Sequence, residues 1–192
     1  MKNIFNITKL TKVSGICGIL ASLIFFSSIL ISIYTSASFK WTNNALSDLG
    51  IDANSFVYFN VGLILCGLLF FIFSLGFTKI LDNKIGKYLL IIAPLSLIGV
   101  GLFSESFFIP HYIFSVLFFA SFSLSLLVSG IILIKNKQDK AMGIIACFFS
   151  IIAFSSIILL FFFKGIAIPE AFASFPGLVW YQTYGVKIAI QS

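Results

Sequence analysis

Hydrophobic residues occur in long runs along this chain, and short polar segments separate them. A membrane core of about 30 Å needs roughly 20 mainly apolar residues in a helix. The runs do not alternate with polar residues as barrel strands do, and in lipid a helix satisfies its own backbone polar groups. We therefore predict an all-α, polytopic integral membrane bundle that forms one transmembrane domain over residues 1–192. The predicted spans cover about 13–34, 56–77, 88–103, 112–134, 141–163 and 172–190.

The first and last runs need separate arguments. The first follows Lys2, Lys9 and Lys12 and resembles a signal peptide, but it is longer than the 7–15 residues of that apolar region. We expect it to remain as the first span. The last run is less apolar and contains Gln182 and Lys187. It is either a sixth span or a segment whose aromatic residues lie in the membrane interface.

Composition supports a membrane protein and charge predicts its orientation. Hydrophobic residues make up 60% of the chain and charged residues 9%, with a mean hydropathy of +1.14, whereas soluble domains are about 25% charged. The net charge of +6 could suggest nucleic acid, but the positive-inside rule explains it better. If both termini are cytoplasmic, all 12 basic residues except Lys40 and Lys164 fall on the cytoplasmic side. We predict a multi-pass cell membrane protein with lipid as its surroundings, no nucleic-acid partner and the possibility of a homo-oligomer.

The most polar stretch between the runs is Trp41–Gly50. With six spans, its Ser47 and Asp48 lie on the outer side together with residues of the other two outward connections. Those residues are Ser104, Glu105, His111 and Glu170. The three connections lie at one end of a small bundle, so their side chains can converge there.

Each of these residues also has a purely local explanation. Asp48 can cap a helix or hold a turn, and Glu170 after Pro169 suits the first turn of a helix. His111 can simply begin a span. Glu105 at the end of the third span is unfavourable for the helix dipole, so it needs a partner or exposure to water.

Sequence motifs exclude several enzyme classes and leave others open. The chain has no phosphate-binding loop, dinucleotide fingerprint or His-Glu-x-x-His zinc motif. A catalytic triad could combine Ser47 or Ser104 with His111 and either Asp48 or Glu105, although no Gly-x-Ser-x-Gly turn supports it. One histidine with three carboxylates suits Mg²⁺ or Ca²⁺ better than zinc. The metal and any cofactor therefore stay unknown.

The polar segments resemble those of a known family. Asn44-Ala-Leu-Ser-Asp-Leu-Gly50, Gly101-Leu-Phe-Ser-Glu105 and His111 with Phe118-Phe119 are similar to motifs of the DUF998-type family of prokaryotic, largely archaeal, six-span membrane proteins. Ala45 and Ser104 stand where that family often has proline, which affects turn rigidity and leaves the polar groups in place. The resemblance implies a fold and no substrate, because the family's activity is not established.

Three functional hypotheses follow. The first is a polar pocket at the outer face, built from Ser47, Asp48, Ser104, Glu105, His111 and Glu170, which binds a lipid headgroup, a small ligand or a cation. The second is a membrane-embedded hydrolase of a lipid-like substrate, with His111, Glu105 and Asp48 as catalytic candidates. The third is a structural or assembly protein whose polar residues only cap helices. Mutual distances discriminate between them, because a site requires the side chains to converge.

Overall fold

The computed structural model describes residues 2–81 and 83–191, with side chains described from Leu10 onward. Over these residues it contains helices only, together with turns and irregular connections. The α-helices are α1 (Lys2–Thr35), α2 (Phe56–Phe77), α3 (Lys84–Leu102), α4 (Ile109–Ile134), α5 (Lys140–Leu159) and α6 (Ala167–Gln191). Two short 3-10 helices, η1 (Ser47–Gly50) and η2 (Glu105–Phe107), lie in the connections. The all-helical fold class is thus confirmed.

Five helices are long and apolar enough to cross a membrane, as expected for a multi-pass membrane protein. They comprise Leu10–Thr35 of α1 and the full lengths of α2, α3, α4 and α5. The described part of α6 does not belong to this set, since Gln182 and Lys187 lower its apolar character. The sixth span therefore stays a prediction.

Helix ends differ from the predicted span ends where polar residues continue or stop a helix. The first helix starts at Lys2 rather than near residue 13, because residues 2–12 continue it without a helix breaker. The fifth helix ends at Leu159, and Leu160–Phe163 form an apolar turn instead of a last helical turn. The sixth starts at Ala167, ahead of Pro169, which is tolerated in the first helical turn.

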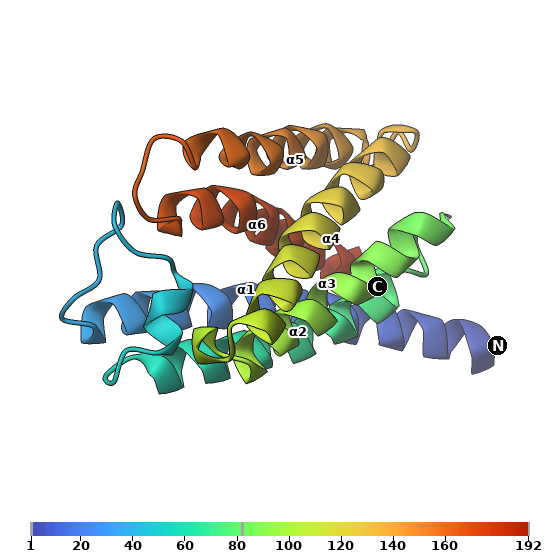
Figure 1. Cartoon of the computed structure of the whole chain (residues 1–192). Helices are drawn as coiled ribbons and strands as arrows, with labels where there is room; N and C mark the ends of the chain where they lie inside the picture. Colours follow the sequence, from blue (N-terminus) through green and yellow to red (C-terminus); the bar gives the residue numbers. More distant parts are fainter. Residues whose placement is uncertain (1, 82, 192) are drawn as a thin grey trace.

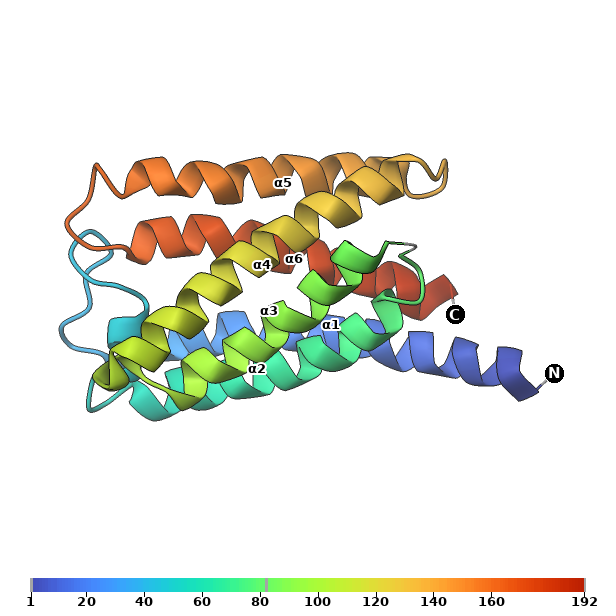
Figure 2. The same ribbon diagram turned by 45° about the vertical axis from the view of Figure 1, so that its right-hand side comes forward.

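The helices form a ring in chain order. Each packs against the next one along the chain, and α6 closes the ring by packing against α1. The connections α1–α2, α3–α4 and α5–α6 lie at one end, which we call the connection end (Figures 1 and 2). Both termini and the other two connections lie at the opposite end (Figure 2). This places the candidate residues of three distant segments at the same end of the bundle.

Buried aromatic rings and interhelical hydrogen bonds fill the middle of the ring. Phe70, Phe73 and Tyr181 lie within 6 Å of one another by ring centroids and are almost completely buried. The Tyr181 hydroxyl pairs with the Ser125 hydroxyl at 2.8 Å, so the phenol oxygen is satisfied in a water-poor environment. Aromatic pairs of this kind add about 0.5–1.5 kcal/mol each beyond the area they bury.

Small residues allow close helix contacts, as is typical of membrane bundles. A Cβ at Gly15 would lie 2.6 Å from the Gly185 carbonyl oxygen, so α1 and α6 touch through backbone. A Cβ at Gly143 would lie 2.8 Å from the Gly130 carbonyl oxygen, which brings α4 and α5 together near the end with the termini. From that contact α4 and α5 diverge toward the connection end (Figures 1 and 2).

Candidate functional site

Asp48 organises the turn that leads into η1. Its Oδ2 accepts hydrogen bonds from the Asn44 side-chain nitrogen at 2.7 Å and from the Ala45 backbone N–H at 3.0 Å. A carboxylate that reaches back to a free N–H near a helix start works like one half of a capping box. These bonds fit the turn-holding alternative for Asp48, and Asn44 supplies the side-chain donor.

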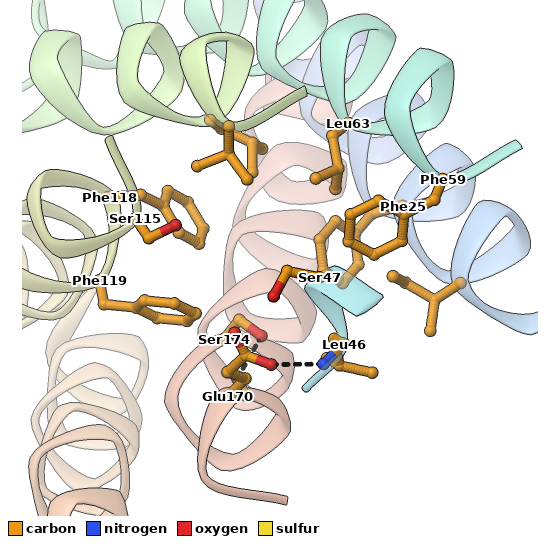
Figure 3. Close-up of a pocket in the computed structure, with 13 residues that line it drawn as sticks. Phe25, Leu46, Ser47, Phe59, Leu63, Ser115, Phe118, Phe119, Glu170 and Ser174 are labelled. Carbon is orange, nitrogen blue, oxygen red and sulfur yellow. Dashed lines mark hydrogen bonds between the residues drawn. The ribbon is translucent and has the colours of Figure 1, made fainter. Parts of the chain in front are cut away.

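The segment before η1 pairs with the α5–α6 connection through backbone groups. Gly165 N–H donates to Thr42 O and Ala167 N–H donates to Asn44 O, both at 2.9 Å. Glu170, in the first turn of α6, continues this pairing, because its Oε2 accepts from Leu46 N–H at 2.6 Å (Figure 3). The carboxyl group of Glu170 therefore joins α6 to η1 across more than a hundred residues of sequence.

A small cavity of about 40 Å³ lies under η1. Ser47, Ser115, Glu170 and Ser174 contribute polar atoms to its lining (Figure 3). Leu46 and apolar side chains from α1, α2, α3 and α4 form the rest. Ser174 donates its hydroxyl proton to the Glu170 backbone carbonyl at 2.7 Å. Glu170 thus stands at the boundary between the apolar interior and the connection end.

Glu105 lies in η2, past the end of α3 at Leu102. Burial raises the pKa of its carboxyl group, and a hydrogen bond with the Asp48 carboxyl and the negative charge of Asp48 raise it further, while the Ser47 hydroxyl lowers it. One carboxyl oxygen, Oε2, is enclosed without a hydrogen-bond partner. Two carboxyl groups in contact favour a shared proton, because both cannot easily ionise side by side.

His111 is held by a strained turn. Phe108 precedes α4 with φ 42°, a left-handed conformation that costs a bulky residue energy. His111 is the third residue of α4. Its Nδ1 lies 2.8 Å from Phe103 O. A carbonyl only accepts, so Nδ1 carries the proton and Nε2 is an acceptor in the neutral ring. The ring orientation is therefore set by the residue that follows α3.

A cavity of about 520 Å³ lies between α4, α5 and α6. Four of the candidate residues line it: Ser47, Glu105, His111 and Glu170. Most other lining residues are apolar, and the lining follows α4 from His111 down to Ser123. The cavity is therefore amphipathic, with ionisable groups toward the connection end and apolar walls below them.

The remaining two candidates, Asp48 and Ser104, do not line the large cavity. Asp48 does not line the large cavity but contacts Glu105, which does. Ser104 precedes η2 and lines neither cavity, so it is not brought to the others. In the part of the chain that the structure describes, no group of three or more His, Cys, Asp and Glu residues is arranged to hold a metal ion.

Sequence reasoning missed the wall that α5 contributes. Ala153, Phe154, Ser156 and Ile157 line the large cavity, but they lie in a largely apolar run without a motif. It also missed Gly165, whose N–H pairs with Thr42. Asn44 was a sequence signal for this pairing, because it lies in the polar segment Trp41–Gly50 and its carbonyl accepts from Ala167 N–H.

The charge state of Glu170 makes stability depend on pH. Burial raises its pKa to about 8 from 4.5; the Leu46 N–H opposes this, and the charges of Glu105 and Asp48 add to it. Between these values the folded state holds a proton that the unfolded state releases, so stability falls as pH rises through this window. We expect the apparent Tm of detergent-purified protein to decline from pH 4.5 toward pH 8 and then to level off.

Glu170→Gln should flatten that decline, because glutamine does not titrate and its carbonyl can still accept from Leu46. Asp52→Asn is the matched control: Asp52 is a carboxylate at the same end, bound by Asn54 N–H and by Ser36, and its pKa is lowered. An unchanged slope in Glu170→Gln would contradict the assignment.

Comparison with known proteins places the chain in a family. No curated protein and no solved structure matches it. A family model described as "protein of unknown function (DUF998)" matches residues 19–187. The match includes every residue of both cavities. The chain belongs to the DUF998 family of proteins of unknown function.

Proposed function

We propose that the protein binds a lipid-like amphiphile in the large cavity. The apolar part of the ligand lies along α4, α5 and α6, and its polar head meets Ser47, Glu105, His111 and Glu170. One observation carries the proposal: a cavity of about 520 Å³ combines apolar walls with ionisable groups from separate segments. Ligand pockets typically measure about 300–1,000 Å³ and have few polar groups on largely apolar walls.

Access from the lipid supports this ligand class. Four lining residues are also exposed on the surface: Tyr112 and Val116 on α4, Ile157 on α5 and Leu160 just after α5. The cavity thus opens sideways between α4 and α5, where these helices diverge. An amphiphile in the bilayer can enter through this opening without leaving the apolar phase.

In the proposed topology both termini are cytoplasmic, residues 172–190 of α6 form the sixth span and the connection end faces outward. The positive-inside rule supports it, since Lys135, Lys137, Lys140 and Lys187 lie toward the end with the termini. The packing of α6 beside α1 and α5 also supports a span. The polar end of the cavity then lies at the outer face of the cell membrane.

A hydrolase is the second candidate, because His111 has one ring nitrogen held by Phe103 and the other left as a base. In this reading His111 activates water against a bound lipid, and a nearby carboxyl group orients it. Release of product from a labelled lipid, lost in His111→Ala, would favour hydrolysis over binding alone. A purely structural role predicts neither binding nor turnover.

Filling the cavity tests the binding proposal. Ala153→Phe places a ring in the cavity from α5, and we expect it to remove binding of hexadecyl amphiphiles seen as adducts by native mass spectrometry. The probes are hexadecylamine, hexadecanol and hexadecyl phosphate, so the test does not depend on the head. Ile151→Phe is the matched control, since Ile151 is 62% exposed on the same helix and does not line the cavity.

Binding that Ala153→Phe leaves intact would contradict the proposal, as would the absence of adducts with all three probes. The apparent Tm of each variant shows whether the helix bundle remains folded.

A further inference from the structure

We infer that the head of the cavity's ligand is a protonated primary amine, that is, an ammonium group on an apolar chain. The inference rests on the proposed function and adds the class of ligand. It is carried by the charge of the polar end, by the hydrogen-bonding groups left free there, and by the apolar walls below.

The polar end presents acids and no strong cation. The titratable groups that line it are Glu105 from η2, His111 and Tyr112 from α4, and Glu170 from α6. Asp48 from η1 does not line the cavity, but its carboxyl group contacts that of Glu105. Among the residues that the structure describes, the α5 wall contributes no titratable side chain and no lysine lines the cavity. A phosphate or sulfate head would therefore meet carboxyl groups with only an imidazole to balance them, whereas a cation is attracted.

The hydrogen-bonding inventory also calls for a donor. The nearby backbone N–H groups of Ala45 and Leu46 are already used by Asp48 and Glu170. Two acceptors remain, namely the enclosed Oε2 of Glu105 and, when the His111 ring is neutral, its Nε2, since Nδ1 is taken by Phe103 O. The hydroxyls of Ser115 and Tyr112 also line the cavity and can either donate or accept. An ammonium group supplies three N–H donors and accepts none, so it complements this set.

The ionisation of the carboxyl groups is compatible with this exchange. Burial and the neighbouring acid raise the pKa of Glu105, and burial raises that of Glu170 to about 8, which favours the protonated carboxyl forms when no ligand is bound. An ammonium group favours the carboxylate form and takes the place of those protons. Amine binding then releases protons, and its affinity rises with pH toward the Glu170 pKa of about 8.

The apolar walls distinguish an amine on a chain from a free metal ion. Ca²⁺ and Mg²⁺ require about six or more oxygen ligands around one point. A bound metal ion would make no use of the apolar surface that α4 and α5 provide. An alkylammonium uses both parts of the cavity. Metal ions therefore serve as a comparison in the experiment.

The experiment ranks probes that share one chain and differ in the head. Native mass spectrometry of the detergent-purified protein would measure binding of hexadecylamine, hexadecyltrimethylammonium, hexadecanol and hexadecyl phosphate, and of Ca²⁺ alone. Because charge-assisted hydrogen bonds contribute about 1.5–3 kcal/mol, we expect the primary amine to bind roughly 10- to 100-fold more tightly than the alcohol. The quaternary cation, which has no N–H, should bind less tightly than the amine, and the phosphate least tightly.

A double variant and a control test whether the carboxyl groups cause the preference for the amine. Glu105→Gln combined with Glu170→Gln should bring the amine down to the affinity of the alcohol and remove the rise of amine affinity with pH. Asp52→Asn is the control, because it removes a carboxylate at the same end that does not line the cavity. It should leave the ranking unchanged.

The outcomes separate the two proposals. Equal binding of amine, alcohol and phosphate, or tighter binding of the phosphate, would overturn the amine inference and leave the lipid-binding proposal standing. Tight binding of Ca²⁺ that competes with the amine would also overturn it in favour of a metal site. If the wild-type protein binds none of the probes, lipid binding itself is contradicted.

Discussion

Gly165→Ala is expected to detach the α5–α6 connection from residues 42–46 and to abolish amphiphile binding. A Cβ at this position would overlap the backbone of Asn43 and Asn44, and backbone cannot move aside as a flexible side chain can. The hydrogen bonds from Gly165 N–H to Thr42 O and from Ala167 N–H to Asn44 O would be lost with the contact. Glu170 would then move away from Leu46, because the α5–α6 connection leads directly into the helical turn that carries Glu170.

The expected effect on stability is large for one methyl group. Overpacking costs about 1–3 kcal/mol, and each kcal/mol shifts Tm by roughly 2–4 °C in a chain of this length. We expect the apparent Tm to fall by roughly 5–10 °C once the lost hydrogen bonds are included. Thermal unfolding in detergent, followed by tryptophan fluorescence, measures the shift, and native mass spectrometry measures the loss of binding.

Gly86→Ala is the matched control. A Cβ there would lie 3.0 Å from Val128 Cγ1, the tip of a side chain that can rotate, and alanine favours a helix over glycine. Its Tm should change little. If Gly165→Ala behaves like Gly86→Ala, the backbone pairing does not position Glu170.

Asp139→Ala is expected to produce the second large loss, at the opposite end of the bundle. Asp139 accepts from Lys187 Nζ at 2.6 Å, from the Tyr184 hydroxyl at 3.1 Å and from the Asn136 side chain at 2.7 Å. These bonds join the start of α5 to the last turns of α6. Removing the carboxylate leaves a partly buried ammonium without its counter-ion and takes the acceptor of the Tyr184 phenol away.

The size of this loss depends on how far water screens the pair. Removing one partner of a fully buried ion pair costs about 3–5 kcal/mol. The Lys187 side chain is 23% exposed and that of Asp139 is 10% exposed, and Lys187 keeps a bond to Gln138 O. We therefore expect about 1–3 kcal/mol, seen as a lower apparent Tm.

A double-mutant cycle isolates the ion pair from general damage. Asp139→Ala and Lys187→Met, alone and together, should show a coupling energy, because the two charges touch. Lys137→Gln is the control, since it removes an exposed charge from the same connection. Additive losses in the cycle would mean that the pair contributes no stability beyond its separate contacts.

The two ends of the bundle therefore hold α5 in different ways. Near the termini, Asp139, Trp180 and the Gly130–Gly143 contact bind α5 closely to α6 and α4; Trp180 Nε1 donates to Met142 O at 2.8 Å. Toward the connection end α5 leaves α4 and the cavity opens between them. A variant weakened at Asp139 should consequently lose stability more than it loses the preference for one head over another.

The sequence by itself determined the helical fold, its helices and the end at which the polar residues gather. The physical reason is that lipid requires helices with internally bonded backbones, so apolar runs become helices and the polar segments between them fall at alternate ends. That alternation assigned Ser47, Asp48, Glu105, His111 and Glu170 to one end before any contact was visible. Asp48 as a turn holder and Glu170 in a first helical turn were likewise predictable, because those roles depend on near neighbours in the chain.

Only the tertiary structure decided which of these residues meet and what surrounds them. Asp48 and Glu105 are in contact, Glu170 binds Leu46 N–H, and Ser104 stays outside. The pairing of Gly165 with Thr42 uses backbone atoms, which carry no side-chain signal in a sequence. The cavity arises because small residues let α4 and α5 touch at one end and diverge at the other. An apolar run looks the same whether it faces lipid or a cavity, so the α5 wall could be recognised only once the helices were placed together.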